Sequence, residues 1–168
     1  KHGRSVKALK DDWMTKRITF INFLKIGINP NASILDVGCG VGFLCQYLRQ
    51  RGWKGKYTGI DINPDMIAQA KKDLPNEEFI CLDIAKEKDK LKMYDYVVCC
   101  AILEIVPSKK YLKQMVKAMF SLTKNALVFN VFSDRVDFKD NFHLYISPQW
   151  ILGFCFSLTN RLLLRNDT

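Results

Sequence analysis

The sequence predicts an α/β fold with a doubly wound, mostly parallel sheet. Three observations predict this class: apolar runs of strand length recur along the chain, segments of helical periodicity separate them, and a glycine-rich turn joins the first run to the first helix. A late run, residues 126–132, is nearly continuous in apolar residues, as burial on both faces of a sheet requires.

The first strand and turn lie in residues 34–43, Ile-Leu-Asp-Val-Gly-Cys-Gly-Val-Gly-Phe. Three glycines alternate with other residues after the acidic Asp36, and a helical pattern starts at about Phe43. Glycine lets the backbone turn sharply and leaves main chain bare for a ligand that side chains would otherwise block. The segment therefore predicts the first half of a βαβ unit with a ligand-binding turn.

Three further predicted strands end in polar residues or cysteine; they are residues 57–61, 78–83 and 94–100. Asp61 lies 23 positions after Gly38, near the ~20-residue offset of an acid that binds ribose hydroxyls in a βαβ nucleotide site. The carboxyl ends of parallel strands share one edge of the sheet, where ligands bind. We therefore expect Asp36, Asp61, Asp83 and Cys100 to converge there.

The remaining elements complete the predicted fold as one domain, residues 1–168. We expect helices at about 10–27, from Asn63-Pro64, over 109–120 and from Ser147-Pro148 through 156, a fifth strand over 126–132 and a sixth over 161–165. The first helix could lie over the ligand edge, with Trp13, Lys16 and Arg17 near the ligand, or could instead pack on the flank of the sheet.

Composition is that of a globular domain, with 48% hydrophobic and 26% charged residues. The sequence contains no 18-residue apolar run, so we expect no membrane span. Six cysteines without a C-x-x-C pair are best explained as reduced thiols in a cytoplasmic protein, and two histidines make a metal site unexpected. The net charge of +9 is spread along the chain without an arginine-rich stripe, which disfavours a nucleic-acid partner.

Four segments resemble, in order and spacing, the motifs of class I S-adenosylmethionine-dependent methyltransferases. They are Asp-Val-Gly-Cys-Gly-Val-Gly at 36–42, Gly-Ile-Asp-Ile-Asn-Pro-Asp-Met-Ile at 59–67, Leu-Asp-Ile at 82–84 and Tyr-Asp-Tyr-Val-Val-Cys-Cys-Ala-Ile-Leu-Glu at 94–104. The resemblance covers roughly residues 5–165. It implies a Rossmann-like methyltransferase fold, S-adenosylmethionine as methyl donor and S-adenosylhomocysteine as product.

The resemblance also implies which residues bind the donor. The backbone of the glycine turn would approach the methionine portion, with Asp36 ordering the turn; the turn residues are Gly38, Cys39, Gly40 and Gly42. A donor without phosphates needs no lysine in this turn, and the sequence has no Gly-Lys-Ser/Thr ending there.

The next two motifs and the fourth strand would bind the rest of the donor. The resemblance implies that Asp61 accepts hydrogen bonds from both ribose hydroxyls and that Ile62 packs on the adenine. Asp83, beside Ile84, would accept from the adenine amino group. Backbone near Cys100 would hold the ammonium group. The rival interpretation, a nicotinamide-binding domain, would prefer the third glycine one position later and a second substrate domain.

Three residues are candidates for a catalytic role. Glu104 lies just past the fourth strand and is the first candidate for a general base. Members of the family often have a histidine directly after this glutamate, where this chain has Ile105. His143 and Tyr145 fall where a substrate-covering loop is expected. Each has a structural alternative: a helix cap for Glu104, a surface residue for His143 and an aromatic plug for Tyr145.

The acceptor is approached by elimination. The fourth strand continues as Cys-Cys-Ala-Ile, without the Asn/Asp-Pro-Pro-Tyr/Phe motif of many enzymes that methylate base amino groups or amides, and no Pro-Cys dipeptide occurs. The expected acceptor is a small molecule methylated on oxygen or nitrogen. The alternatives are RNA or protein as acceptor, and a relative that binds the donor without turnover.

Members of this family usually end with a seventh, antiparallel strand. This chain stops after Thr168, without a segment for it. A sheet of six strands would leave an exposed edge. We therefore expect that the sequence is truncated at its C-terminus.

Overall fold

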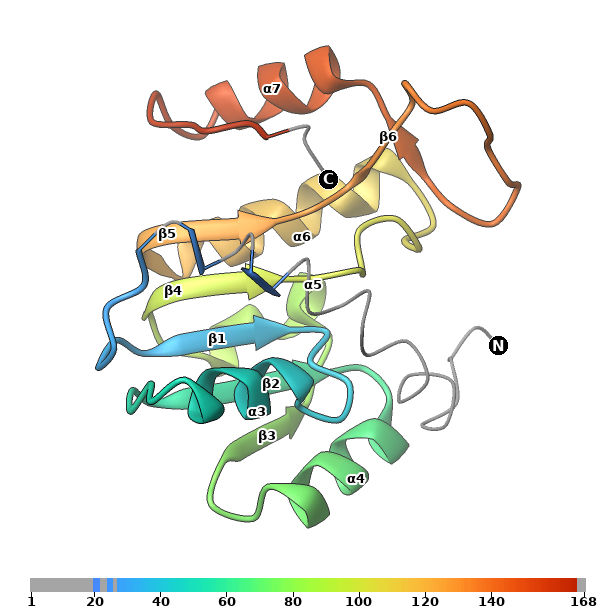
Figure 1. The fold of residues 1–168 in the computed structure, drawn as a ribbon. Helices are drawn as coiled ribbons and strands as arrows, with labels where there is room; N and C mark the ends of the chain where they lie inside the picture. The colour runs from blue at the N-terminus through green and yellow to red at the C-terminus, as the bar shows by residue number, and fades with distance from the viewer. Residues whose placement is uncertain (1–19, 22–23, 26, 166–168) are drawn as a thin grey trace.

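The computed structural model describes residues 20–21, 24–25 and 27–165. Five parallel strands form the central sheet: β1 (Ile34–Val37), β2 (Tyr57–Asp61), β3 (Glu78–Cys81), β4 (Tyr94–Cys99) and β5 (Thr123–Phe129). Their order is β3-β2-β1-β4-β5, so the chain winds outward from β1 in both directions (Figure 1). The predicted α/β class with a doubly wound parallel sheet is confirmed.

Helices connect the strands, and a small second sheet follows β5. The helices are α3 (Phe43–Gln50), α4 (Pro64–Asp73), α5 (Ile84–Glu87), the 3₁₀ turn η1 (Lys88–Lys90), α6 (Lys109–Ser121) and α7 (Pro148–Phe156). The two short strands β6 (Phe132–Ser133) and β7 (Tyr145–Ile146) pair in parallel. Side-chain oxygens of Asn63, Ser108 and Ser147 accept backbone hydrogen bonds at the starts of α4, α6 and α7.

Two hydrophobic cores lie on opposite faces of the sheet. In one core, Ile34 of β1 packs with residues of α3 and α4 and with Phe20. In the other, Leu35 of β1 packs with residues of α6 and α7. Successive residues of β1 thus enter different cores, because side chains alternate along a strand. Because side chains on both faces of the sheet are buried, the strands are held in place, and so is the edge that carries the glycine turn.

Three strands differ from prediction in their bounds, and the smallest difference is in β4, which ends at Cys99, one residue early. β5 begins at Thr123 and ends at Phe129, three residues earlier than the apolar pattern indicates. It ends there because the Asn130 side chain turns to bond the backbone after β4. β3 ends at Cys81, because the Asp83 carboxylate accepts the Ala85 N–H and so caps α5.

The predicted sixth strand is wrong, because residues 161–165 form no strand in the structure. Three leucines in this segment, Leu162, Leu163 and Leu164, are 39%, 75% and 46% exposed, so their apolar run reflects no buried strand. Of the predicted first helix, residues 20, 21 and 24 are helical. Trp13, Lys16 and Arg17 lie outside the described residues.

Candidate functional site

The glycine turn after β1 lies at the carboxyl edge of the sheet, between the ends of β2 and β4 (Figure 1). Gly38, Gly40 and Gly42 have φ of 77°, 54° and 82°, the left-handed region that glycine adopts without strain. A Cβ on Gly38 would lie 2.2 Å from the Cγ1 of Ile102. The turn therefore presents bare main chain, closely approached from the side of β4.

Asp61 lies against this turn, as predicted. Its Oδ2 accepts the Gly40 N–H at 3.0 Å, and its Oδ1 accepts the Asn63 N–H at 2.9 Å. One carboxylate thus connects the glycine turn to the start of α4. The next residue, Ile62, is 72% exposed, so an apolar surface adjoins the carboxylate.

Asp36 lies on the buried side of the glycine turn. It is buried, and its Oδ2 accepts a 2.6 Å hydrogen bond from the Tyr57 hydroxyl. Burial first, and then the Asp36 charge, raise the pKa of Tyr57 well above its usual value. Burial followed by the charges of Asp36 and Asp61 likewise raises the pKa of Cys39, so this thiol in the turn stays protonated at neutral pH.

Asp83 is held by several partners at the same edge. Its Oδ1 accepts the Tyr111 hydroxyl at 2.9 Å, and its Oδ2 lies 2.8 Å from Lys86 Nζ. Burial raises the pKa of Asp83, but hydrogen bonds from Lys86, Tyr111 and Ala85 outweigh it, so the pKa lies below the usual value. Ile84 is buried in the core, which leaves only its backbone for a ligand.

The backbone after β4 is strained. Ala101 has φ 57°, and it alone among the described non-glycine residues has a positive φ. This conformation costs about 1–2 kcal/mol, and such strain concentrates at functional sites. The Asn130 Oδ1 accepts the Ala101 N–H at 2.9 Å and so holds the turn beside Cys100.

The structure brings the segments of the three catalytic candidates together. The Leu144 N–H donates to the Glu104 carbonyl at 2.6 Å, which places the neighbours of Leu144, His143 and Tyr145, beside the chain that follows β4. Glu104 itself is buried, with 4% of its surface exposed. The candidates thus lie on the β4 side of the glycine turn.

An aspartate orients the His143 ring. Asp140 Oδ2 lies 2.6 Å from His143 Nδ1, and its Oδ1 accepts the His143 backbone N–H at 2.9 Å. The hydrogen bond from His143 is the main cause of the lowered pKa of Asp140. The Phe132 ring has two aromatic neighbours, with its centroid 5.1 Å from that of His143 and 5.9 Å from that of Tyr145.

Three residues at this edge are not predicted as site residues from the sequence: Tyr111, Asn130 and Asp140. Tyr111 occurs in an amphipathic helix pattern, and Asn130 occurs inside an apolar run predicted as strand. Neither position carries a signal in the sequence, because their partners are 28 and 29 residues away. Asp140 lies three residues before His143, a spacing that could have indicated the pair.

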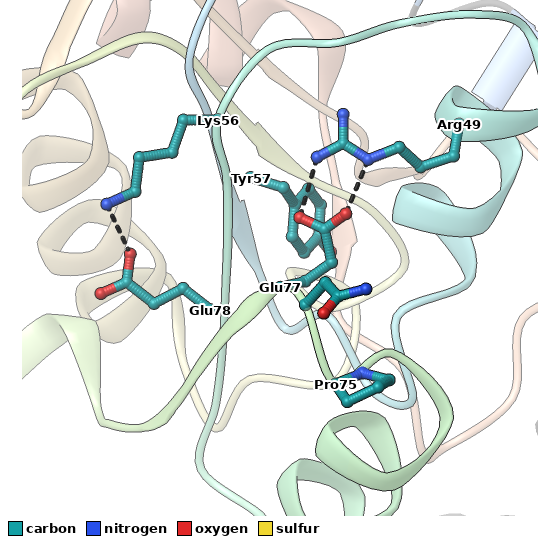
Figure 2. A pocket seen from close by; sticks show the side chains of 7 residues that line it. Arg49, Lys56, Tyr57, Pro75, Glu77 and Glu78 are labelled. Carbon is teal, nitrogen blue, oxygen red and sulfur yellow. Dashed lines mark hydrogen bonds and ion pairs between the residues drawn. The ribbon is translucent and has the colours of Figure 1, made fainter.

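A hollow of about 420 Å³ lies at the opposite, amino edge of the sheet (Figure 2). Arg49 makes two bonds to Glu77, of 2.6 and 2.8 Å, and Lys56 Nζ lies 3.2 Å from Glu78. All four charged side chains that line it are thus paired with one another. The hollow contains none of the predicted site residues, and its charged groups have structural partners.

The part of the chain that the structure describes, residues 20–21, 24–25 and 27–165, holds no candidate metal site. No three or more His, Cys, Asp or Glu side chains gather there in a way that could hold a metal ion. None of the helices in those ranges combines the length and the apolar character needed to cross a bilayer.

Comparison with known proteins identifies relatives. The family model "Methyltransferase domain" matches residues 34–126, more than half of the chain. The malonyl-[acyl-carrier protein] O-methyltransferase of Anoxybacillus flavithermus is 31% identical over 64% of this chain, and the trans-aconitate 2-methyltransferase of Rhodopseudomonas palustris is 28% identical over 67%. The matches span 42% and 43% of those two proteins.

A solved structure shares the fold. The magnesium protoporphyrin IX methyltransferase of Synechocystis, crystallised with bound S-adenosylmethionine, superposes with a TM-score of 0.70 and 21% identity. The superposition covers 94% of this chain and 75% of the other.

Proposed function

Because the chain belongs to the class I S-adenosylmethionine-dependent methyltransferase family, we propose that it transfers a methyl group from S-adenosylmethionine to an oxygen or nitrogen of a small-molecule acceptor. The observation that carries the proposal is the Asp61 carboxylate placed against a bare glycine turn. S-adenosylhomocysteine is then the product. The sulfonium supplies an electrophilic methyl group, so the protein chiefly positions the reactants.

The described residues fit this donor. The turn from Gly38 to Gly42 offers main chain without side chains at its three glycines, which suits close approach of the methionine portion. Each Asp61 oxygen has one backbone donor in the structure and retains acceptor capacity for a ribose hydroxyl. The exposed Ile62 offers an apolar face for the adenine.

We assign the remaining donor contacts on the same basis. Asp83 would face the adenine amino group, with the backbone of Ile84 beside it. The strained turn at Cys100 and Ala101 would hold the ammonium group through its backbone. Asp36 would order the glycine turn from the buried side, and Cys39 would contribute backbone while its thiol stays protonated.

The names of relatives support a small acceptor. One is named as an O-methyltransferase of malonyl-[acyl-carrier protein], and another as a 2-methyltransferase of trans-aconitate. We propose a small molecule for this chain too, in preference to RNA or a folded protein. We also propose a cytoplasmic location, supported by four buried free thiols. That residues 1–168 form one domain stays a prediction.

Donor binding is the direct test. Isothermal titration with S-adenosylhomocysteine should give one site, and ligand at 100 times Kd should stabilise the fold by about 2.7 kcal/mol. That corresponds to a rise in Tm of about 5–10 °C for a chain of this size. NAD⁺ and ATP serve as control ligands. Equal stabilisation by NAD⁺, or no heat with S-adenosylhomocysteine, would contradict the proposal.

A further inference from the structure

The loop between β6 and β7 carries a histidine–aspartate pair, and the end of this loop is bonded to the segment that follows β4. We propose that His143 Nε2 accepts the proton of an aromatic hydroxyl acceptor, and that Asp140 holds the imidazole in the tautomer that this requires. The inference rests on the proposed methyl transfer and names the acceptor class. Here His143 is the catalytic residue and Asp140 a positioning residue.

The geometry of Asp140 defines the ring. Its Oδ2 lies 2.6 Å from His143 Nδ1, while its Oδ1 accepts the backbone N–H groups of Phe142 and His143 at 2.8 and 2.9 Å. A carboxylate is an acceptor, so the imidazole proton lies on Nδ1. Nε2 then carries the lone pair, which is the state of a general base.

The His143–Asp140 pair lies at the same edge of the sheet as the glycine turn. Leu144, next to His143, donates its N–H to the Glu104 carbonyl, and Ile102, two residues before Glu104, packs on Gly38. A short series of contacts therefore runs from the glycine turn to the histidine. The His143 side chain keeps 22% of its surface exposed, so it is accessible yet held.

An aromatic ring lies close to the imidazole, and other aromatic residues lie nearby in the chain. The Phe132 centroid is 5.1 Å from that of His143 and 5.9 Å from that of Tyr145. The same loop exposes 79% of Phe138 and 86% of Phe142. Flat apolar groups prefer to pack on such rings. These aromatic residues belong to β6 and to the same short loop as His143, which favours an acceptor whose hydroxyl is attached to an aromatic body.

The chemistry explains why the hydroxyl matters. A phenol of pKa ~10 is mostly protonated at neutral pH and needs a base, whereas a carboxylate is already ionised. The acceptor oxygen bonds to the methyl carbon, the carbon–sulfur bond breaks with its electron pair left on sulfur, and the hydroxyl proton passes to Nε2. The products are the aryl methyl ether, S-adenosylhomocysteine and imidazolium, which later loses its proton to water.

The tautomer can be observed without turnover. The chain has two histidines, so a long-range ¹H–¹⁵N spectrum contains two imidazole patterns, and His143→Gln identifies one. We expect His143 to be the Nδ1–H tautomer and Asp140→Asn to shift it toward Nε2–H. Asp137→Asn, the same change in the same loop, should leave it unaltered. An Nε2–H tautomer in the unaltered protein would overturn the proposal.

Turnover tests the acceptor class with 2-naphthol and 2-naphthoate as probes. We expect 2-naphthol to be methylated, with kcat about 100-fold lower in His143→Gln and about 10-fold lower in Asp140→Asn. Asp137→Asn should keep full activity, and all variants should bind S-adenosylhomocysteine as before. If the unaltered protein does not bind S-adenosylhomocysteine, the proposed function is refuted. Normal donor binding with no methylation of 2-naphthol, or unchanged kcat in His143→Gln, refutes this inference alone.

Discussion

The two edges of the sheet differ in how they satisfy polar groups and backbone geometry. At the amino edge, the Arg49 guanidinium donates to both Glu77 oxygens and to the carbonyls of Trp53 and Gly55. At the carboxyl edge, three glycines and Ala101 adopt left-handed conformations, and an apolar Ile62 is exposed. The hollow in Figure 2 belongs to the first edge.

A concave surface is therefore weaker evidence of a binding site than a bare glycine turn with a carboxylate, Asp61, bonded to it. Charges that bond one another stabilise a fold, and they leave nothing for a ligand to satisfy. Bare turns and exposed apolar side chains stabilise the fold little, and they gain from a partner. Substitutions at the amino edge should therefore change stability, whereas those at the carboxyl edge should change donor affinity.

The largest expected effect is on stability, from Gly55→Ala at the amino edge. A Cβ there would lie 1.9 Å from the Ala32 carbonyl oxygen, a backbone atom, and 2.7 Å from the Trp53 ring. Such overpacking should cost about 3 kcal/mol and lower Tm by about 6–12 °C. Urea unfolding measures the loss. Gly153→Ala in α7 meets nothing within 4 Å and is the control, expected to be neutral or stabilising.

Gly55→Ala should leave the affinity of the folded protein for S-adenosylhomocysteine within about twofold, or ~0.4 kcal/mol, of the original. A larger loss of affinity would contradict the division of roles between the two edges. That result would mean that the amino edge contributes to the donor site.

A somewhat smaller effect, this time on affinity, is expected for Asp61→Ala. Loss of hydrogen bonds between a carboxylate and two ribose hydroxyls should weaken S-adenosylhomocysteine binding about 30- to 100-fold. The lost bonds to Gly40 and Asn63 should cost the fold about 1 kcal/mol. Isothermal titration and urea unfolding of the same variant separate the two effects.

Glu77→Gln is the matched control for Asp61→Ala. It removes a carboxylate charge at the amino edge and should lower stability while leaving donor affinity unchanged. An affinity loss in Glu77→Gln equal to that in Asp61→Ala would show that general charge, and not the ribose contact, governs binding.

The smallest effect is a pH dependence at the amino edge. Hydrogen bonds from the backbone N–H and hydroxyl of Ser33 hold the pKa of Asp95 below its usual value. A pKa lower in the folded state contributes stability above the unfolded value of about 4, and this is lost as pH falls through the folded pKa. Asp95→Asn should therefore lower Tm by a few degrees at most at pH 7, and the difference should shrink toward pH 2.5.

Thermal unfolding from pH 2.5 to 7 measures this difference. The pKa of Asp95 would not be linked to folding if the gap between the two proteins stayed constant over that range. Donor affinity at pH 7 should be the same for both.

The places of the glycine turn and of Asp61 could be predicted from the sequence better than the surroundings of His143. Alternating glycines have a backbone requirement that is visible in the sequence, and Asp61 follows them at a spacing set by one βαβ unit. The surroundings of Cys100 and His143 depend on contacts between distant segments, such as Asn130 with Ala101 and Leu144 with Glu104. Spacing along the chain does not encode such contacts.

The errors have the same origin. An apolar run predicts burial but does not show that a partner strand exists. The run at 161–165 therefore predicts a strand, whereas these residues form none in the structure. The predicted end of β5 is wrong because the Asn130 side chain bonds Ala101, in the segment that follows β4. The individual site assignments, Glu104 and Tyr145 included, stay predictions until variants are measured.

Ala101 has a consequence for how this protein can be engineered. Exchanging it for glycine would relieve the left-handed strain in the native state, yet it would also widen the conformational freedom of the denatured chain. These contributions oppose each other, so thermal resistance is a poor guide to this position. The methyl group on Ala101 instead restricts the turn, and a looser turn would lose more entropy each time a ligand became ordered against it.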